Sequence, residues 1–190
     1  MIKEPDNNSC DILEENLLDQ RKIFLFGDIE DEIAEKTVKQ LHYLASINSL
    51  PISIYVNSSG GSVDSALSII DTINLIKQTI IIKTIGYQVG SSAAYILAFG
   101  SEGYRYGLPN SSVMLHSVTL ELPENEANKQ ESFMKFTKEH IANLESQVAK
   151  ACKKKLKEFS EAIQNDLYMN AKQAKNYKII DKIITRLDEI

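Results

Sequence analysis

The chain is short of cysteine and of long apolar runs, and each shortage excludes a class of protein. Two cysteines among 190 residues, Cys10 and Cys152, cannot form a metal site alone, and nothing indicates an oxidising compartment. No stretch approaches the ~18 uncharged apolar residues of a membrane span. The first twenty residues lack the apolar region of a signal peptide. We therefore expect a cytoplasmic protein with no membrane association and no metal.

Basic residues are not in excess either. The net charge of −5 argues against nucleic acid as a partner, because a phosphate-binding surface needs a basic excess. The lysine cluster from Lys150 to Lys157 continues a helical pattern and is interpreted as a solvated helix face. A length of 190 residues with 43% hydrophobic content fits one globular domain with a real core.

The first half of the chain alternates strand-like and helix-like segments. Short apolar runs bounded by glycine, serine or asparagine predict buried strands, and apolar residues three or four apart predict helices. This β-α-β-α-β order implies parallel strands joined by right-handed crossovers. The predicted strands span residues 22–29, 52–57 and 79–86, and the predicted helices span 30–48 and 63–76.

The pattern changes after Gly100. Two short strand-like pieces flank a Pro-Asn turn, and a long amphipathic helix is expected over residues 126–157. A short helix, a loop around "NDLYMN", a helix at "AKQAKNY" and a final strand "IIDKIITRL" complete the prediction. No internal repeat or low-complexity linker interrupts the chain.

Two segments at the carboxyl ends of predicted strands, "NSSGGSV" and "GYQVGSS", could form a site. Ligands gather at this edge of a parallel sheet, and a Gly-Gly pair can turn its N–H groups toward a shared cleft. A serine opening the next helix lies at the positive end of the helix dipole. Together these are the parts of an acyl-transfer site, with a hydroxyl nucleophile and backbone oxyanion donors. A glycine turn followed by a serine that caps the helix explains the same residues.

A serine nucleophile needs a neighbouring base, and the chain has three histidines. His42 and His140 fall within predicted helices, where a surface or interface imidazole is expected. His116 ends the apolar run "SVML" at a strand's edge, from which its ring can reach a neighbouring loop. Considered by itself, His116 is better interpreted as a structural histidine.

Several motifs, in order and spacing, resemble the proteolytic subunit of the Clp protease, the caseinolytic protease P family. "YVNSSGGSV" and "GSSAAYILAFGSEGYRYGLPNSSVMLHS" are similar to that family's N-S-P-G-G, A-S-M-G-A and P-N-x-x-x-M-x-H segments. "NDLYMNAKQAKNYKIID" and "DILEENLLDQRKIFLFGDIEDEIA" extend the similarity over most of the chain. The resemblance implies that Ser91 is the nucleophile, His116 the general base and Asp166 the third member of a triad. It also implies an oxyanion hole made by the backbone N–H groups of Gly61 and Ser92.

The resemblance further implies an α/β, crotonase-like fold with a protruding helix-strand handle at about residues 117–157. Residues 1–20 would form an axial segment, and residues 21–190 the catalytic domain. The expected assembly is a homo-oligomer of two stacked heptameric rings that degrades unfolded polypeptides. An AAA+ Clp unfoldase would supply ATP hydrolysis, so this chain needs no cofactor of its own. Tyr55 and Leu75 are candidates for the apolar pocket that binds this partner.

The sequence departs from the family pattern at six places. Ser59 replaces the proline before the Gly-Gly pair, "GYQVGS" is one residue longer than usual, and Ala93 replaces a glycine. "HSV" replaces His-Gln-Pro, and "LELPENEANKQ" replaces a Gly-rich segment. A lead of ten residues, "MIKEPDNNSC", precedes the "DI" motif. These departures concern substrate preference, ring packing and gating.

Two other functions stay open. A non-catalytic subunit of a mixed ring would share the fold, although such subunits usually lack a triad residue. An acyl-CoA hydratase or isomerase of the crotonase type would use paired backbone N–H groups on a thioester, but it would need a carboxylate beside them instead of a Ser-His pair.

Overall fold

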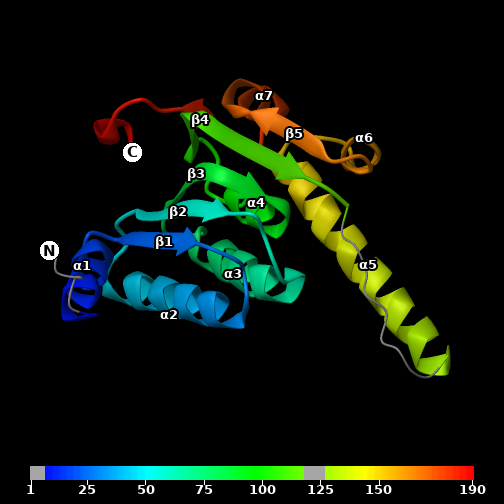
Figure 1. The fold of residues 1–190 in the computed structure, drawn as a ribbon, viewed down its shortest axis with the longest axis horizontal. Coiled ribbons are helices and arrows are strands. Elements are labelled where there is room, and N and C mark those ends of the chain that lie inside the picture. The colour runs from blue at the N-terminus through cyan, green and yellow to red at the C-terminus, as the bar shows by residue number, and fades with distance from the viewer. Residues whose placement is uncertain (1–6, 118–126) are drawn as a thin grey trace, which may run out of the picture.

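A computed structural model describes residues 7–117 and 127–190, and this part of the chain forms one mixed sheet with helices packed on it (Figure 1). The strand order is β1-β2-β3-β4-β5, with β6 beside β4. The pairs β1–β2, β2–β3, β3–β4 and β4–β6 are parallel, and β4–β5 is antiparallel. The strands are β1 (Lys22–Phe26), β2 (Ile52–Ser58), β3 (Ile82–Gly90), β4 (Arg105–Leu115), β5 (Leu167–Asn170) and β6 (Lys182–Ile183).

Helices α2, α3 and α4 cover one face of this sheet (Figure 1). Their apolar residues and those of the strands form the main core, which includes fully buried Leu41, Ile73 and Leu97. The helices are α1 (Asn7–Asp19), α2 (Asp31–Ile47), α3 (Val63–Ile76), α4 (Ser91–Ala98), α5 (Ala127–Ala151), α6 (Leu156–Ile163) and α7 (Ala171–Tyr177), followed by a 3-10 turn at Leu187–Glu189.

The predicted β-α-β-α-β unit is confirmed, with parallel neighbours throughout. The main difference is at β3, which continues to Gly90 instead of ending at Gly86. Between these residues the register with β2 shifts, since Val56 pairs with Gly86 but Ser58 pairs with Val89. One extra residue of β3 is therefore absorbed as a bulge, which accommodates the additional residue in "GYQVGS".

The second half of the chain corrects several predictions. The two pieces predicted around a Pro-Asn turn form one strand, β4, whose Pro-Asn segment lies in an irregular register against β3. Most of the predicted loop "NDLYMN" is strand β5, because it pairs with β4. The final strand is only two residues long. Helix α1, which the sequence analysis did not predict, packs beside β1.

The long helix also ends earlier than predicted. Helix α5 ends at Ala151, and Lys153 takes a left-handed conformation with φ of 56°. The N–H of Lys154 donates to the carbonyl of Ala149, five residues back, as in a Schellman helix end. Helix α6 is thus a separate element. The strand expected in the helix-strand handle, at residues 119–122, lies outside the described residues.

The opposite face of the sheet carries a small second cluster, made of Tyr55, Ile85, Tyr106 and Ile184. Phe24 stacks on Tyr55 with ring centroids 4.7 Å apart. This face is partly open, since Phe24 is 44% exposed. Within the described residues, no helix is long and apolar enough to cross a membrane.

Candidate active site

Ser91 lies at the junction between β3 and α4. Gly90 ends the strand, and Ser91 opens the helix with a positive φ of 52°. Non-glycine residues rarely adopt this conformation, which costs about 1–3 kcal/mol and is typical of strained functional turns. The half-buried hydroxyl is thereby presented at the N-terminus of a helix that is otherwise buried.

The Ser91 hydroxyl is hydrogen-bonded to His116, with 2.8 Å between Oγ and Nε2. The other ring nitrogen, Nδ1, lies 2.8 Å from the carbonyl oxygen of Ser117. A carbonyl can only accept, so Nδ1 carries the proton and Nε2 has a free lone pair. Nε2 therefore accepts from the hydroxyl, which is the direction that a general base requires.

Asp166 lies close to this pair along the backbone but does not contact it. Leu115 pairs with Leu167 at the end of the antiparallel ladder between β4 and β5. One further residue on each strand brings His116 opposite Asp166. The Asp166 side chain is exposed, and among the described residues no hydrogen bond joins it to the imidazole. The Ser117 carbonyl, instead of the Asp166 carboxylate, accepts the hydrogen bond from Nδ1.

Asp181, another acid in the C-terminal region, has a different role. Its carboxylate accepts from Arg105 Nη2 at 2.7 Å and Nε at 2.9 Å, and from the N–H of Gly103 at 2.8 Å. Partial burial acts to raise the pKa of Asp181, but the hydrogen bonds and charge of Arg105 outweigh it and hold the pKa below its ordinary value. Asp181 is thus committed to a structural ion pair.

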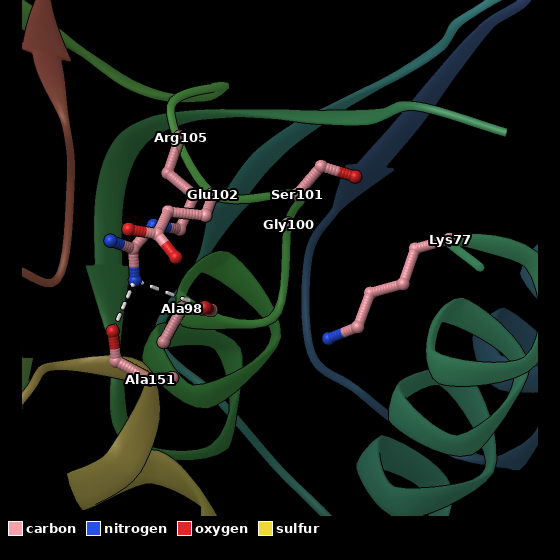
Figure 2. A pocket seen from close by; sticks show the side chains of 7 residues that line it. All are labelled: Lys77, Ala98, Gly100, Ser101, Glu102, Arg105 and Ala151. Carbon is pink, nitrogen blue, oxygen red and sulfur yellow. Dashed lines mark hydrogen bonds between the residues drawn. The ribbon is translucent and has the colours of Figure 1, made fainter. Parts of the chain in front are cut away.

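The Arg105 side chain of this pair also ties two helices together. Its Nη1 donates to the carbonyl of Ala151, at the end of α5, over 2.8 Å, and to that of Ala98, at the end of α4, over 3.4 Å (Figure 2). A pocket of about 360 Å³ opens beside it, bordered by Lys77, Ser101 and Glu102. The planar guanidinium of Arg105 therefore joins the ends of α4 and α5 to the Asp181 carboxylate. None of these bonds involves the Ser91 hydroxyl.

The backbone N–H groups of Gly61 and Ser92 are the candidates for the predicted oxyanion hole. Ser92 is in the first turn of α4, where N–H groups have no partner within a helix. Gly61 forms a parallel bridge to Ile29 through the carbonyl of Gly60 and the N–H of Ser62, which leaves its own N–H on the other side. The Ser92 hydroxyl donates to the Gly61 carbonyl at 3.3 Å, so the two residues are adjacent. Among the described residues, neither N–H has a hydrogen-bond partner.

The Gly-Gly turn fits closely around the serine. A Cβ on Gly60 would lie 2.6 Å from the Cβ of Ser91, and one on Gly61 would lie 2.5 Å from the carbonyl oxygen of Ile29. Both positions therefore require glycine. Ser58 stabilises this turn, because its hydroxyl accepts from the N–H of Gly60 at 3.0 Å. That bond supports the turn although Ser59 stands at the position of the family's proline.

A pocket of about 410 Å³ is lined by residues that precede Ser91 and His116 in the chain, although neither of the two lines it. It is bordered by Gly90 and Met114, which precede the serine by one residue and the histidine by two. Its other walls come from the carboxyl ends of β1, β2 and β3 and from β4 and β5, and they include Asn57, Gln88 and Tyr168. Its size suits a side chain or a short peptide segment.

The remaining candidate residues lie elsewhere. His42 and His140 are exposed on α2 and α5, as predicted. Tyr55 is 5% exposed on the open face of the sheet, whereas Leu75 is 65% exposed on α3, and the structure gives no contact between them.

Cys152 is fully buried, and burial raises the pKa of its thiol to about 12. It therefore stays protonated and offers no competing nucleophile. In the residues that the structure describes, no cluster of histidine, cysteine and acidic side chains could hold a metal ion.

The sequence analysis missed the carbonyl of Ser117 as the group that orients His116. A main-chain acceptor leaves no signal in residue identity, so no pattern could have indicated it.

The family model described as Clp protease matches residues 5–187 of the chain, and the match spans every residue of the site. The mostly parallel mixed sheet, with seven helices within the described residues, is consistent with the crotonase-like fold predicted from the sequence.

Proposed function

Since the chain belongs to the Clp protease family and is a Clp-type peptidase by that membership, we propose that it is an active serine endopeptidase subunit. Ser91 is the nucleophile and His116 the general base. The single observation that carries this proposal is the 2.8 Å hydrogen bond from the Ser91 hydroxyl to Nε2 of an imidazole whose Nδ1 bears the proton. A non-catalytic subunit would have no need of that pairing.

In the proposed reaction, Ser91 Oγ attacks the scissile carbonyl while its proton passes to His116 Nε2. The carbonyl oxygen becomes an oxyanion held by the N–H groups of Gly61 and Ser92, each worth about 3 kcal/mol in the transition state. His116 then gives the proton to the leaving amine, and an acyl ester remains on Ser91. A water molecule, deprotonated by the same imidazole, hydrolyses this ester and restores the enzyme.

Asp166 is proposed as the group that stabilises the protonated imidazole. Its position opposite His116 in the extended β4–β5 register supports this role. A rotation of the carboxylate toward the ring would let it accept from Nδ1 in place of the Ser117 carbonyl. An ionised acceptor holds an imidazolium more strongly than a neutral carbonyl does.

The proposal includes assembly into a ring-shaped chamber served by an ATP-driven unfoldase. Helix α5 supports the assembly, because it runs away from the sheet (Figure 1). Its C-terminal residues Leu144 and Val148 are buried, whereas Phe136, farther out, is 65% exposed. An exposed aromatic residue on a helix that extends from the sheet is suited to contact between subunits. The unfoldase pocket, with Tyr55 and Leu75 as candidates, remains part of this proposal.

The first prediction tests the nucleophile. Ser91→Ala should reduce hydrolysis of a short fluorogenic peptide by at least about a thousandfold, because the other groups supply only residual catalysis. Oligomer size, measured by light scattering, should not change. Ser92→Ala is the matched control and should keep most of the activity, since the oxyanion donor at residue 92 is a backbone N–H. Full activity in Ser91→Ala would refute the assignment.

A fluorophosphonate probe separates this function from the alternatives. It should label the wild-type protein on the peptide that contains Ser91. An inert ring subunit or a hydratase, which has no activated serine, would remain unlabelled when correctly assembled.

A further inference from the structure

Tyr95 lies one helical turn after Ser91 on α4, and its side chain reaches the general base. The residue is 2% exposed, and its hydroxyl donates to the main-chain carbonyl of His116 over 3.0 Å. Burial, together with the charge of Glu145, raises the pKa of Tyr95 above its ordinary value. The hydroxyl therefore keeps its proton and is a permanent donor.

The backbone of His116 needs such support because it lies beyond the sheet. The β4–β5 ladder ends at the Leu115–Leu167 pair. The peptide group that follows His116 has two partners: its carbonyl accepts from Tyr95, and its N–H, which belongs to Ser117, donates to the carbonyl of Ile163 at 3.0 Å. Two bonds at opposite ends fix the plane of this peptide.

The orientation of this peptide decides where the imidazole points. The Ser117 carbonyl, which accepts from Nδ1, is the next group along the chain. If the peptide plane rotates, that carbonyl moves and the ring loses the contact that selects its tautomer. Misplacement of a reacting group by about 1 Å can cost a hundredfold in rate.

We propose that Tyr95 is a positioning residue for the peptidase reaction, which fixes His116 against Ser91 by holding the His116–Ser117 peptide. This inference rests on the proposed function. Because Ser91 and Tyr95 are four residues apart on one rigid helix, they share a face of α4. The same helix thus carries the nucleophile and the hydroxyl that holds the base.

The test is Tyr95→Phe, which removes one hydroxyl and leaves the buried ring. The matched control is Tyr177→Phe, because the Tyr177 hydroxyl is the one buried side-chain polar atom without a hydrogen-bond partner among the described residues. For Tyr95→Phe we expect kcat for the fluorogenic peptide to fall about tenfold, with KM within twofold of wild type. Tyr177→Phe should match the wild type in both.

Fluorophosphonate labelling distinguishes positioning from a structural role. In Tyr95→Phe, the labelling rate of Ser91 should fall by the same factor as kcat, while the labelled fraction at completion should equal that of the wild type. A lower labelled fraction at an unchanged rate would mean that the hydroxyl only maintains the fold, and would overturn the inference. Equal rates in both proteins would overturn it too.

The same assay separates this inference from the proposed function. A wild-type protein that neither reacts with the probe nor cleaves the peptide would refute the peptidase assignment itself. A wild type that does both, beside a Tyr95→Phe variant with unaltered kinetics, would refute the role of Tyr95 alone.

Discussion

At the scale of single residues, the site depends on which atom accepts the Nδ1 proton of His116. The Ser117 carbonyl accepts this proton in the structure. Asp166, whose carboxylate is exposed, lies one residue beyond the last pair of the β4–β5 ladder, Leu115–Leu167. A neutral acceptor suffices to select the tautomer. It stabilises the imidazolium less than a carboxylate does, and the reaction forms an imidazolium in both steps.

This difference makes a prediction for Asp166. Replacing it with asparagine should lower kcat by about a hundredfold or more, because the protonated imidazole loses its countercharge while the tautomer is kept. Steady-state peptide hydrolysis measures the effect. Glu161→Gln, which changes a nearby exposed acid on α6, is the control and should leave kcat unchanged. Near wild-type turnover in Asp166→Asn would assign the orienting role to the Ser117 carbonyl alone.

At the scale of elements, the sequence predicted the parts of the fold that repeat a local pattern. The helix at Val63–Ile76 and the parallel β1–β2–β3 unit were predicted because periodicity and turn residues agree there. Strand β5 was missed, since it is only four residues long and follows Asn165 and Asp166, which favour a turn. Pairing with β4 makes it a strand.

The site divides in the same way. The resemblance to the family's motifs predicted Ser91 and His116, which the structure brings together across 25 residues of sequence. The support of His116 by a main-chain carbonyl and a tyrosine hydroxyl could not be predicted, because both contacts depend on where the chain leaves β4. The end of α5 could not be predicted either, because the residue in the left-handed conformation at this helix end is a lysine, where glycine is usual.

That helix end gives a prediction for stability. Lys153→Gly should stabilise the protein by about 0.5–1 kcal/mol, because glycine adopts the left-handed conformation at no steric cost. Lys153 also pairs with Glu102 on the surface, but an exposed pair contributes little. Lys153→Ala loses the same pair and keeps the strain, so it should lie at or below wild type. Thermal melts compare the three proteins, and a less stable glycine variant would contradict the argument.

At the scale of the whole molecule, one buried ion pair joins the sheet to helices α4 and α5. Arg105, on β4, is bonded to Asp181 beside β6 and to the last residues of α4 and α5. The Arg105 side chain is 3% exposed and that of Asp181 is 17% exposed. Loss of either partner would leave a charge largely removed from water.

Asp181→Asn should therefore destabilise the protein by about 3–5 kcal/mol, seen as a lower melting temperature at pH 7. The folded-state pKa of Asp181 is depressed, so its contribution is present above its ordinary pKa and is lost as the pH falls through the lower folded value. The gap between wild type and variant should consequently narrow below about pH 4.

Asp188→Asn is the control for that experiment. It removes an exposed pair with Arg186 and should change stability by less than about 0.5 kcal/mol. A gap for Asp181→Asn that persists unchanged in acid would show that the carboxylate charge is not the source of the stabilisation.

The backbone conformation and close packing at residue 91 limit which nucleophilic side chains this position can hold. A positive φ is poorly tolerated by side chains branched at Cβ, and Gly60 packs so closely that a Cβ on it would lie 2.6 Å from the Cβ of Ser91. A thiol on an unbranched stem would fit the same space, whereas a secondary alcohol would not. Cysteine can therefore replace serine at residue 91. Threonine cannot, unless the turn at Gly60 and Gly61 also changes.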